Sequence, residues 1–137
     1  MSSSSSIRLL LVDDNETNRY SLSRLLTSRG VEVAEAKNGA QALQMAQNVP
    51  DLMLMDIHLP DMSAYDVLQR LRGEPKTANV AVILMSAVEP APDARSMAEV
   101  LGVHSFLTLP VLSQDLWIVI QAALRRPMDR PEEDGRK

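Results

Sequence analysis

The apolar residues of this chain recur with two alternating periods, and this alternation constrains the fold more than any other feature of the sequence. Short, almost wholly apolar runs are typical of strands buried on both faces, and longer stretches repeat apolar residues at helical spacing. The predicted strands are 7–12, 31–36, 51–56, 80–85 and 105–108. The predicted helices are 15–29, a helix after Asn38, a helix after Ser63, 96–101 and a helix after Ser113. Five strand–helix units predict a doubly wound α/β domain, with a parallel sheet covered by helices on both faces.

Polar residues and prolines mark the expected helix starts. Side-chain caps are expected at three of them, from Asn38, Ser63 and Ser113. Pro90 and Pro92 are expected to lengthen and stiffen the connection that precedes the fourth helix. The run at 31–36 alternates apolar and polar residues, which predicts an edge strand with one wetter face.

Composition bounds the function classes. A length of 137 residues with 45% hydrophobic side chains predicts one domain, over 7–126, between a disordered lead-in at 1–6 and a disordered tail or linker at 127–137. The absence of cysteine excludes disulfides and thiolate metal sites, and a net charge of -4 argues against nucleic-acid binding. No apolar run is long enough to cross a membrane and the N-terminus has no signal-peptide pattern, so a cytoplasmic protein without a membrane partner is expected.

Polar residues end the central strands, where ligands of doubly wound folds bind. Asp13 and Asp14 follow the first strand, Asp56 ends the third and Ser86 ends the fourth. Each acid alone is explained as a helix cap or a turn residue. Three carboxylates at one edge of the sheet repel one another unless a cation is present, and hard oxygen ligands suit Mg²⁺. The sequence therefore predicts a magnesium site at this edge.

Several segments, in this order and at these spacings, resemble the receiver domains of bacterial two-component response regulators. They are LLLVDDNETNR at 9–19, NGAQAL at 38–43, DLMLMDIHLPDM at 51–62, Ser86-Ala87, and Gly102 through Phe106 to Pro110. The first and third resemble most the receivers attached to hybrid histidine kinases. The resemblance implies a flavodoxin-like, five-stranded parallel sheet in the order 2-1-3-4-5.

The resemblance also implies roles for the strand-end residues. Asp56 is the expected phosphoacceptor, taking a phosphoryl group from a histidine kinase or a histidine phosphotransfer domain. Mg²⁺ is expected on Asp14 directly, on Asp13 mainly through water, on Asp56, and on the backbone carbonyl of His58. Ser86 is expected to hydrogen-bond the phosphoryl group. The chain would then be a phosphoprotein of a phosphorelay and not an enzyme.

A switch is implied beyond the acceptor. Phe106 is the expected switch aromatic, which changes rotamer after phosphorylation; a plain core role for it competes with this interpretation. Residues 58 and 88 are expected to tune how fast the phosphoryl group is lost. The fourth helix, fifth strand and fifth helix are the expected face for a downstream protein, an output domain or a second copy in a homodimer, near Met97, Leu101, Leu112 and Leu116.

The chain departs from the family pattern at two places. Leu109 stands where the family has a lysine that pairs with the phosphoryl group, a charge-assisted hydrogen bond worth roughly 1.5–3 kcal/mol. Ser63-Ala64 stands where an acidic residue and glycine are common. Two interpretations stay open: a receiver that is phosphorylated but couples weakly to its switch, and a degenerate pseudo-receiver that docks proteins without phosphorylation.

Other site types find little support. The chain has no G-x-x-x-x-G-K-[ST] and no G-x-G-x-x-G motif, which disfavours a nucleotide or flavin enzyme on the same fold. His58 and His104 have no metal-ligand spacing, so their side chains are expected to be loop residues and not zinc ligands. Trp117 is expected in the core.

Overall fold

The predicted strands form one parallel sheet. The computed structural model describes residues 6–125, so the expected tail, and the lead-in apart from Ser6, lie outside the described residues. The strands are β1 (Arg8–Val12), β2 (Glu32–Ala36), β3 (Leu52–Asp56), β4 (Ala81–Ser86) and β5 (Ser105–Thr108). Their order, β2-β1-β3-β4-β5, is the one that the family resemblance implies, and β2 lies at an edge as its alternating pattern predicts.

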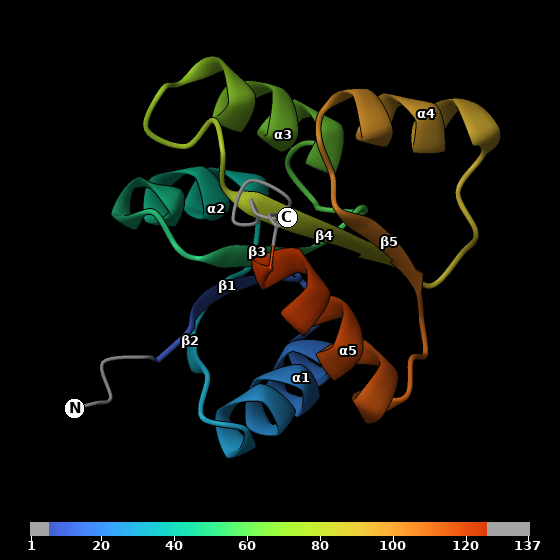
Figure 1. Ribbon diagram of the computed structural model, residues 1–137. Helices are drawn as coiled ribbons and strands as arrows, with labels where there is room; N and C mark the ends of the chain where they lie inside the picture. The colour runs from blue at the N-terminus through green and yellow to red at the C-terminus, as the bar shows by residue number, and fades with distance from the viewer. Residues whose placement is uncertain (1–5, 126–137) are drawn as a thin grey trace, which may run out of the picture.

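The helices cover both faces of this sheet. They are α1 (Glu16–Ser28), α2 (Gly39–Met45, followed by a 3-10 turn at Ala46–Asn48), α3 (Ala64–Gly73), α4 (Pro92–Val100) and α5 (Ser113–Leu124). Helices α1 and α5 lie on one face, and α2, α3 and α4 on the other (Figure 1). The doubly wound α/β fold is therefore confirmed.

The inner strands divide their side chains between two apolar cores. Along β1, for example, Leu10 and Val12 pack toward α2, α3 and α4, while Leu9 and Leu11 pack toward α1 and α5. This alternation is the pleat of a strand buried on both faces, and it explains why the inner strands are almost wholly apolar in sequence. Trp117 packs against the core beneath α1 and α5 without being fully buried.

Two of the three expected caps are present. The side-chain oxygen of Asn38 accepts from the Gln41 N–H, and the Ser63 hydroxyl accepts from the Asp66 N–H. The expected cap of Ser113 is wrong. Leu112 precedes α5 in extended backbone and forms no side-chain cap, so Ser113 is already inside the helix.

Helix α4 begins earlier than predicted. It starts at Pro92, whereas the sequence pattern placed the start near residue 96. Proline is suited to the first helical position because its missing N–H is one that finds no partner within the helix. Pro92 therefore opens α4, and only the residues before it belong to the connection.

Arg72 forms hydrogen bonds with backbone carbonyls at the end of the molecule opposite the carboxyl ends of the strands. Its guanidinium donates to the carbonyls of Ala78 and Val80 before β4, and to those of Leu101 and Gly102 before β5. The end of α3 and the start of both strands are thus held together. Among the described residues, no helix has the length and apolar character required to cross a membrane.

Candidate functional site

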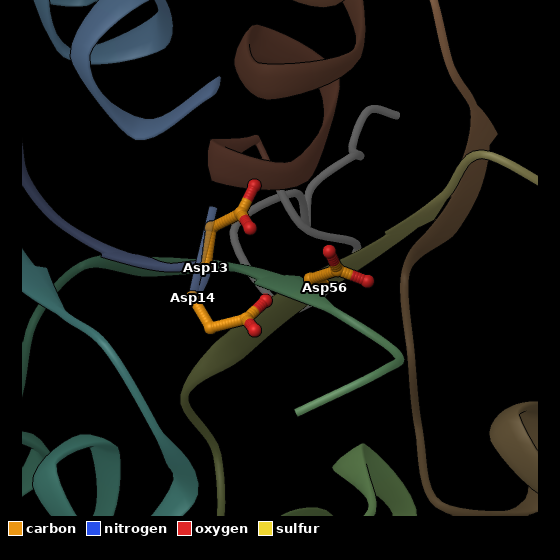
Figure 2. Close-up of side chains that lie close together, drawn as sticks. All are labelled: Asp13, Asp14 and Asp56. Atoms are coloured by element: carbon orange, nitrogen blue, oxygen red, sulfur yellow. The ribbon is translucent and has the colours of Figure 1, made fainter. Parts of the chain in front are cut away.

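Three carboxylates meet at the carboxyl ends of β1 and β3. Asp13 and Asp14 follow β1, and Asp56 is the last residue of β3. The two strands are neighbours in parallel register, which brings these ends together. One carboxylate oxygen from each aspartate lies within 4.8 Å of the others (Figure 2). The sequence prediction that these three acids converge is confirmed.

Asp13 is the buried member of this cluster. It has no exposed surface; its Oδ1 accepts from the Asn15 N–H at 2.9 Å, and its Oδ2 is buried without a hydrogen-bond partner among the described residues. Burial, reinforced by the neighbouring carboxylates of Asp56 and Asp14, raises the pKa of Asp13 to about 6. A buried oxygen with no partner is the feature that a bound cation would satisfy.

Asp56 and Asp14 are more accessible. Asp56 is half-buried and its Oδ1 accepts from the His58 N–H at 2.9 Å, whereas Asp14 is exposed. The cluster thus combines the buried carboxylate of Asp13, the hydrogen-bonded carboxylate of Asp56 and the solvated carboxylate of Asp14. All three offer oxygen ligands, which suit Mg²⁺.

The loop after Asp56 is anchored at both ends. His58 forms an antiparallel bridge with Ser63, and the buried Ala64 donates its N–H to the Ile57 carbonyl at 3.3 Å. The Asp61 carboxylate accepts from the N–H groups of Gly39 and its neighbour in α2, which lowers the pKa of Asp61. The Asp61 contacts were missed in the sequence because they join segments far apart in the chain.

Ser86 lies beside this cluster. It ends β4, one residue beyond the partner of Asp56 in the sheet register, and is 1% exposed. Its Oγ accepts from the Val88 N–H at 3.1 Å, and its carbonyl accepts from the Leu109 N–H at 2.8 Å. The Ser86 side chain is thus connected to the loop that follows it.

Because residue 109 is a leucine, the segment that follows β5 brings no cation to the cluster. The Leu109 side chain packs against the core beneath α1 and α5, and lines an apolar hollow of about 360 Å³. The ion pairs Arg19–Glu35 and Arg95–Glu89 involve no aspartate of the cluster. The side chains of His58 and His104 lie outside the three-residue group.

Phe106 lies under a charged network that sequence reasoning missed. The Arg95 guanidinium lies 5.1 Å from the centre of the partly buried Phe106 ring, and Arg95 also pairs with Glu89 at 3.3 Å. Glu89 accepts a hydrogen bond from the Thr108 hydroxyl at 3.1 Å. The loop after β4 is therefore linked to both α4 and β5, through residues whose sequence spacing gave no signal.

The expected partner face is partly exposed. Met97 on α4 and Leu112 before α5 are 48% and 65% exposed, and the neighbouring Val100 is 86% exposed. Leu101 is half-buried and packs against the core. Leu116 is 1% exposed, so its expected place on this face is wrong: its side chain enters the core under α5.

Comparison with known proteins agrees with this geometry. A family model described as the response regulator receiver domain matches residues 9–121. The response regulator PleD of Caulobacter vibrioides is 36% identical over 77% of this chain, which spans only 23% of PleD. The protein PilH of Pseudomonas aeruginosa is 31% identical over 85% of this chain, with 97% of PilH covered.

Solved structures show the same fold. The receiver domain of the Pseudomonas aeruginosa sensor histidine kinase PA1611, solved with magnesium coordinated in its active-site cleft, is 26% identical with a TM-score of 0.80. The alignment covers 89% of this chain and 100% of the PA1611 receiver chain. A response regulator structure from Chloroflexus aurantiacus is 29% identical with a TM-score of 0.81, covering 88% of this chain and 99% of the other. Receivers of this kind are signalling modules, and the fold, the acidic cluster and the sequence match together show that this chain belongs to the response regulator receiver domain family of two-component systems.

Proposed function

We propose that Asp56 accepts a phosphoryl group from a phosphohistidine of a histidine kinase or a histidine phosphotransfer domain. The observation that carries this proposal is the position of Asp56, clustered with Asp13 and Asp14 and next to Ser86. A free carboxylate oxygen of Asp56 attacks phosphorus, the phosphorus–nitrogen bond to the donor imidazole breaks, and the imidazole nitrogen leaves with the electron pair. Such a transfer depends on positioning and charge neutralisation more than on a base.

The cluster fits Mg²⁺ as its cofactor. The unpartnered Oδ2 of Asp13 and the all-oxygen donor set support this assignment, as does the magnesium in the related PA1611 receiver. We assign direct binding to Asp14, mainly water-mediated binding to Asp13, and further ligands to Asp56 and the His58 carbonyl. When bound, Mg²⁺ neutralises the oxygens of the phosphoryl group and holds them in position.

The remaining roles in the transfer and the switch belong to side chains and backbone groups of the protein. The His58 N–H fixes one oxygen of Asp56, which leaves the other to face the donor. Ser86 donates its hydroxyl hydrogen to a phosphoryl oxygen while still accepting from Val88, so that phosphorylation reaches the loop after β4. We propose that Phe106, whose ring contacts the Arg95 guanidinium, is the side chain that changes rotamer after phosphorylation.

Leu109 sets this receiver apart and supports a second candidate function. Without a cation from this position, charge neutralisation depends more heavily on Mg²⁺, because no side-chain cation of the described residues pairs with the cluster. The second candidate is a pseudo-receiver that docks proteins without phosphoryl transfer. In both functions, the partner-binding face is that of α4, β5 and α5, with Met97 and Leu112 exposed on it.

Covalent phosphorylation tests the choice between these functions. The protein is incubated with Mg²⁺ and acetyl phosphate, and separately with a phosphorylated histidine phosphotransfer domain, and its intact mass is followed. We expect a gain of one phosphoryl group that requires Mg²⁺, is lost in Asp56→Asn, and is kept in the control Asp51→Asn, which alters the residue just before β3, far from Asp56. No adduct from either donor, with Mg²⁺ still bound, would establish the pseudo-receiver.

A further inference from the structure

A hollow of about 270 Å³ lies beside the phosphoacceptor, beneath the loop that joins β4 to α4. Its lining comes from the two residues after Asp56, from Tyr65 at the start of α3, from Ser86, and from loop residues 88–91. The hollow therefore touches both the reacting end of the sheet and the segment that follows Ser86. None of the roles assigned above uses Tyr65.

Tyr65 lines this hollow, and its hydroxyl is unusual. Its oxygen is buried and has no hydrogen-bond partner among the described residues, and burial raises the pKa of Tyr65, which keeps the hydroxyl protonated. A buried hydroxyl without a partner is unfavourable, so any conformation that supplies an acceptor is favoured relative to this one. Tyr20, the other tyrosine of the chain, is 60% exposed and its hydroxyl accepts a hydrogen bond from Arg24.

The loop over the hollow carries acceptors and is coupled to Ser86. In the described backbone, no N–H donates to the carbonyls of residues 87–90. The Val88 N–H donates to Ser86 Oγ, so a shift of Ser86 toward a phosphoryl group on Asp56 draws Val88 along. The side-chain contacts of this loop, from Glu89 to Thr108 and Arg95, involve exposed side chains and are correspondingly weak.

We infer that Tyr65 is a positioning residue for the phosphorylated state, in which its hydroxyl donates a hydrogen bond to a main-chain carbonyl of loop 87–90. The unphosphorylated state leaves the hydroxyl unpaired, and closure of the loop over the hollow pairs it. The difference between the two states biases the loop toward closure once Ser86 has bonded the phosphoryl group. This inference rests on the proposed roles of Asp56 and Ser86.

The test is a comparison of Tyr65→Phe with the parent, using beryllium trifluoride as a mimic of a phosphoryl group on a carboxylate oxygen. Affinity is measured by isothermal titration at saturating Mg²⁺, and stability without the mimic by urea unfolding. We expect Tyr65→Phe to lower the affinity about fivefold, the factor of one neutral hydrogen bond, and to leave the urea midpoint unchanged or raised. The matched control, Tyr20→Phe, is expected to keep the parent affinity.

A second background separates positioning from packing. In Ser86→Ala, the loop is uncoupled from the acceptor, so adding Tyr65→Phe is expected to change the affinity no further. Equal losses in both backgrounds, or a lowered urea midpoint that accounts for the lost affinity, would show a structural role and overturn the inference. Unchanged affinity in Tyr65→Phe would also overturn it, and would leave the proposed function intact. A parent protein that binds no beryllium trifluoride with Mg²⁺ would overturn both proposals.

Discussion

Replacing Asp13 with asparagine removes the charge of a buried carboxylate and keeps the shape of the side chain. The substituted amide retains an oxygen for the Asn15 N–H, and its amide hydrogens face the carboxylates of Asp56 and Asp14. We therefore expect Asp13→Asn to be more stable than the parent in the absence of Mg²⁺. The same variant is expected to lose most of the stabilisation that Mg²⁺ gives the parent, because a ligand has been removed.

The size of this effect follows from the pKa of Asp13. A pKa raised from 3.8 to about 6 corresponds to about 3 kcal/mol of destabilisation at pH values above 6. Between pH 4 and 6, the folded protein keeps a proton on Asp13 that the unfolded chain has released. The folded state then binds more protons, so stability falls as the pH rises through this window. With 3 kcal/mol as the ceiling, we expect about 2 kcal/mol in the variant's favour at pH 7.5.

Urea unfolding measures both parts of this prediction. Trp117 is the single tryptophan and reports unfolding by fluorescence, with EDTA present to remove divalent cations. For a urea m-value of about 2 kcal/mol per molar, the variant's midpoint is expected about 1 M higher at pH 7.5 and close to the parent's at pH 4. The control Asp51→Asn is expected to follow the parent. A variant no more stable than the parent at pH 7.5, or an equal gain at both pH values, would refute the reasoning.

Three further substitutions test other features of the structure. Leu112→Ser supplies the missing cap of α5 and is expected to raise the free energy of unfolding by about 1 kcal/mol; an unchanged urea midpoint would contradict it. Leu109→Lys returns a cation to the cluster and is expected to tighten beryllium trifluoride binding about tenfold by titration, whereas equal affinity would show that the position is indifferent to charge. Gly39→Ala places a Cβ into the Met62 side chain and within 3.2 Å of Val67, which is expected to cost about 1–3 kcal/mol; full stability in urea would show that Met62 moves aside freely.

The sheet was predictable because the pattern of each strand reflects its place. Inner strands such as β3 face apolar cores on both sides, so their sequences are almost wholly apolar, whereas β2 at the edge alternates. Helix starts were predictable where a side chain caps the backbone, as at Asn38. They were not predictable at α4 and α5. Pro92 is the first residue of α4 and Leu112 precedes α5, and neither helix start has a side-chain hydrogen bond.

The site was predictable to the extent that it lies at the ends of strands. Parallel register brings Asp13 and Asp56 together whatever the loops do. Leu116 was placed near the partner face by the family resemblance alone, whereas its side chain enters the core under α5. The unpartnered hydroxyl of Tyr65 had no sequence signal, since it depends on how α3 and the loop after β4 pack.

The Arg72 hydrogen bonds determine where this molecule can bend. They fix the turn that leads from α4 into β5 to the start of β4, so the C-terminal end of α4 is a pivot. The N-terminal end of α4 is held by the connection that begins after Ser86 and by the contacts of Arg95 with Glu89 and Phe106. We therefore expect a swing of α4 to have a larger amplitude at Pro92 than near Val100. Spectroscopic labels that report switching belong at the first of these ends, with the second as the stationary reference.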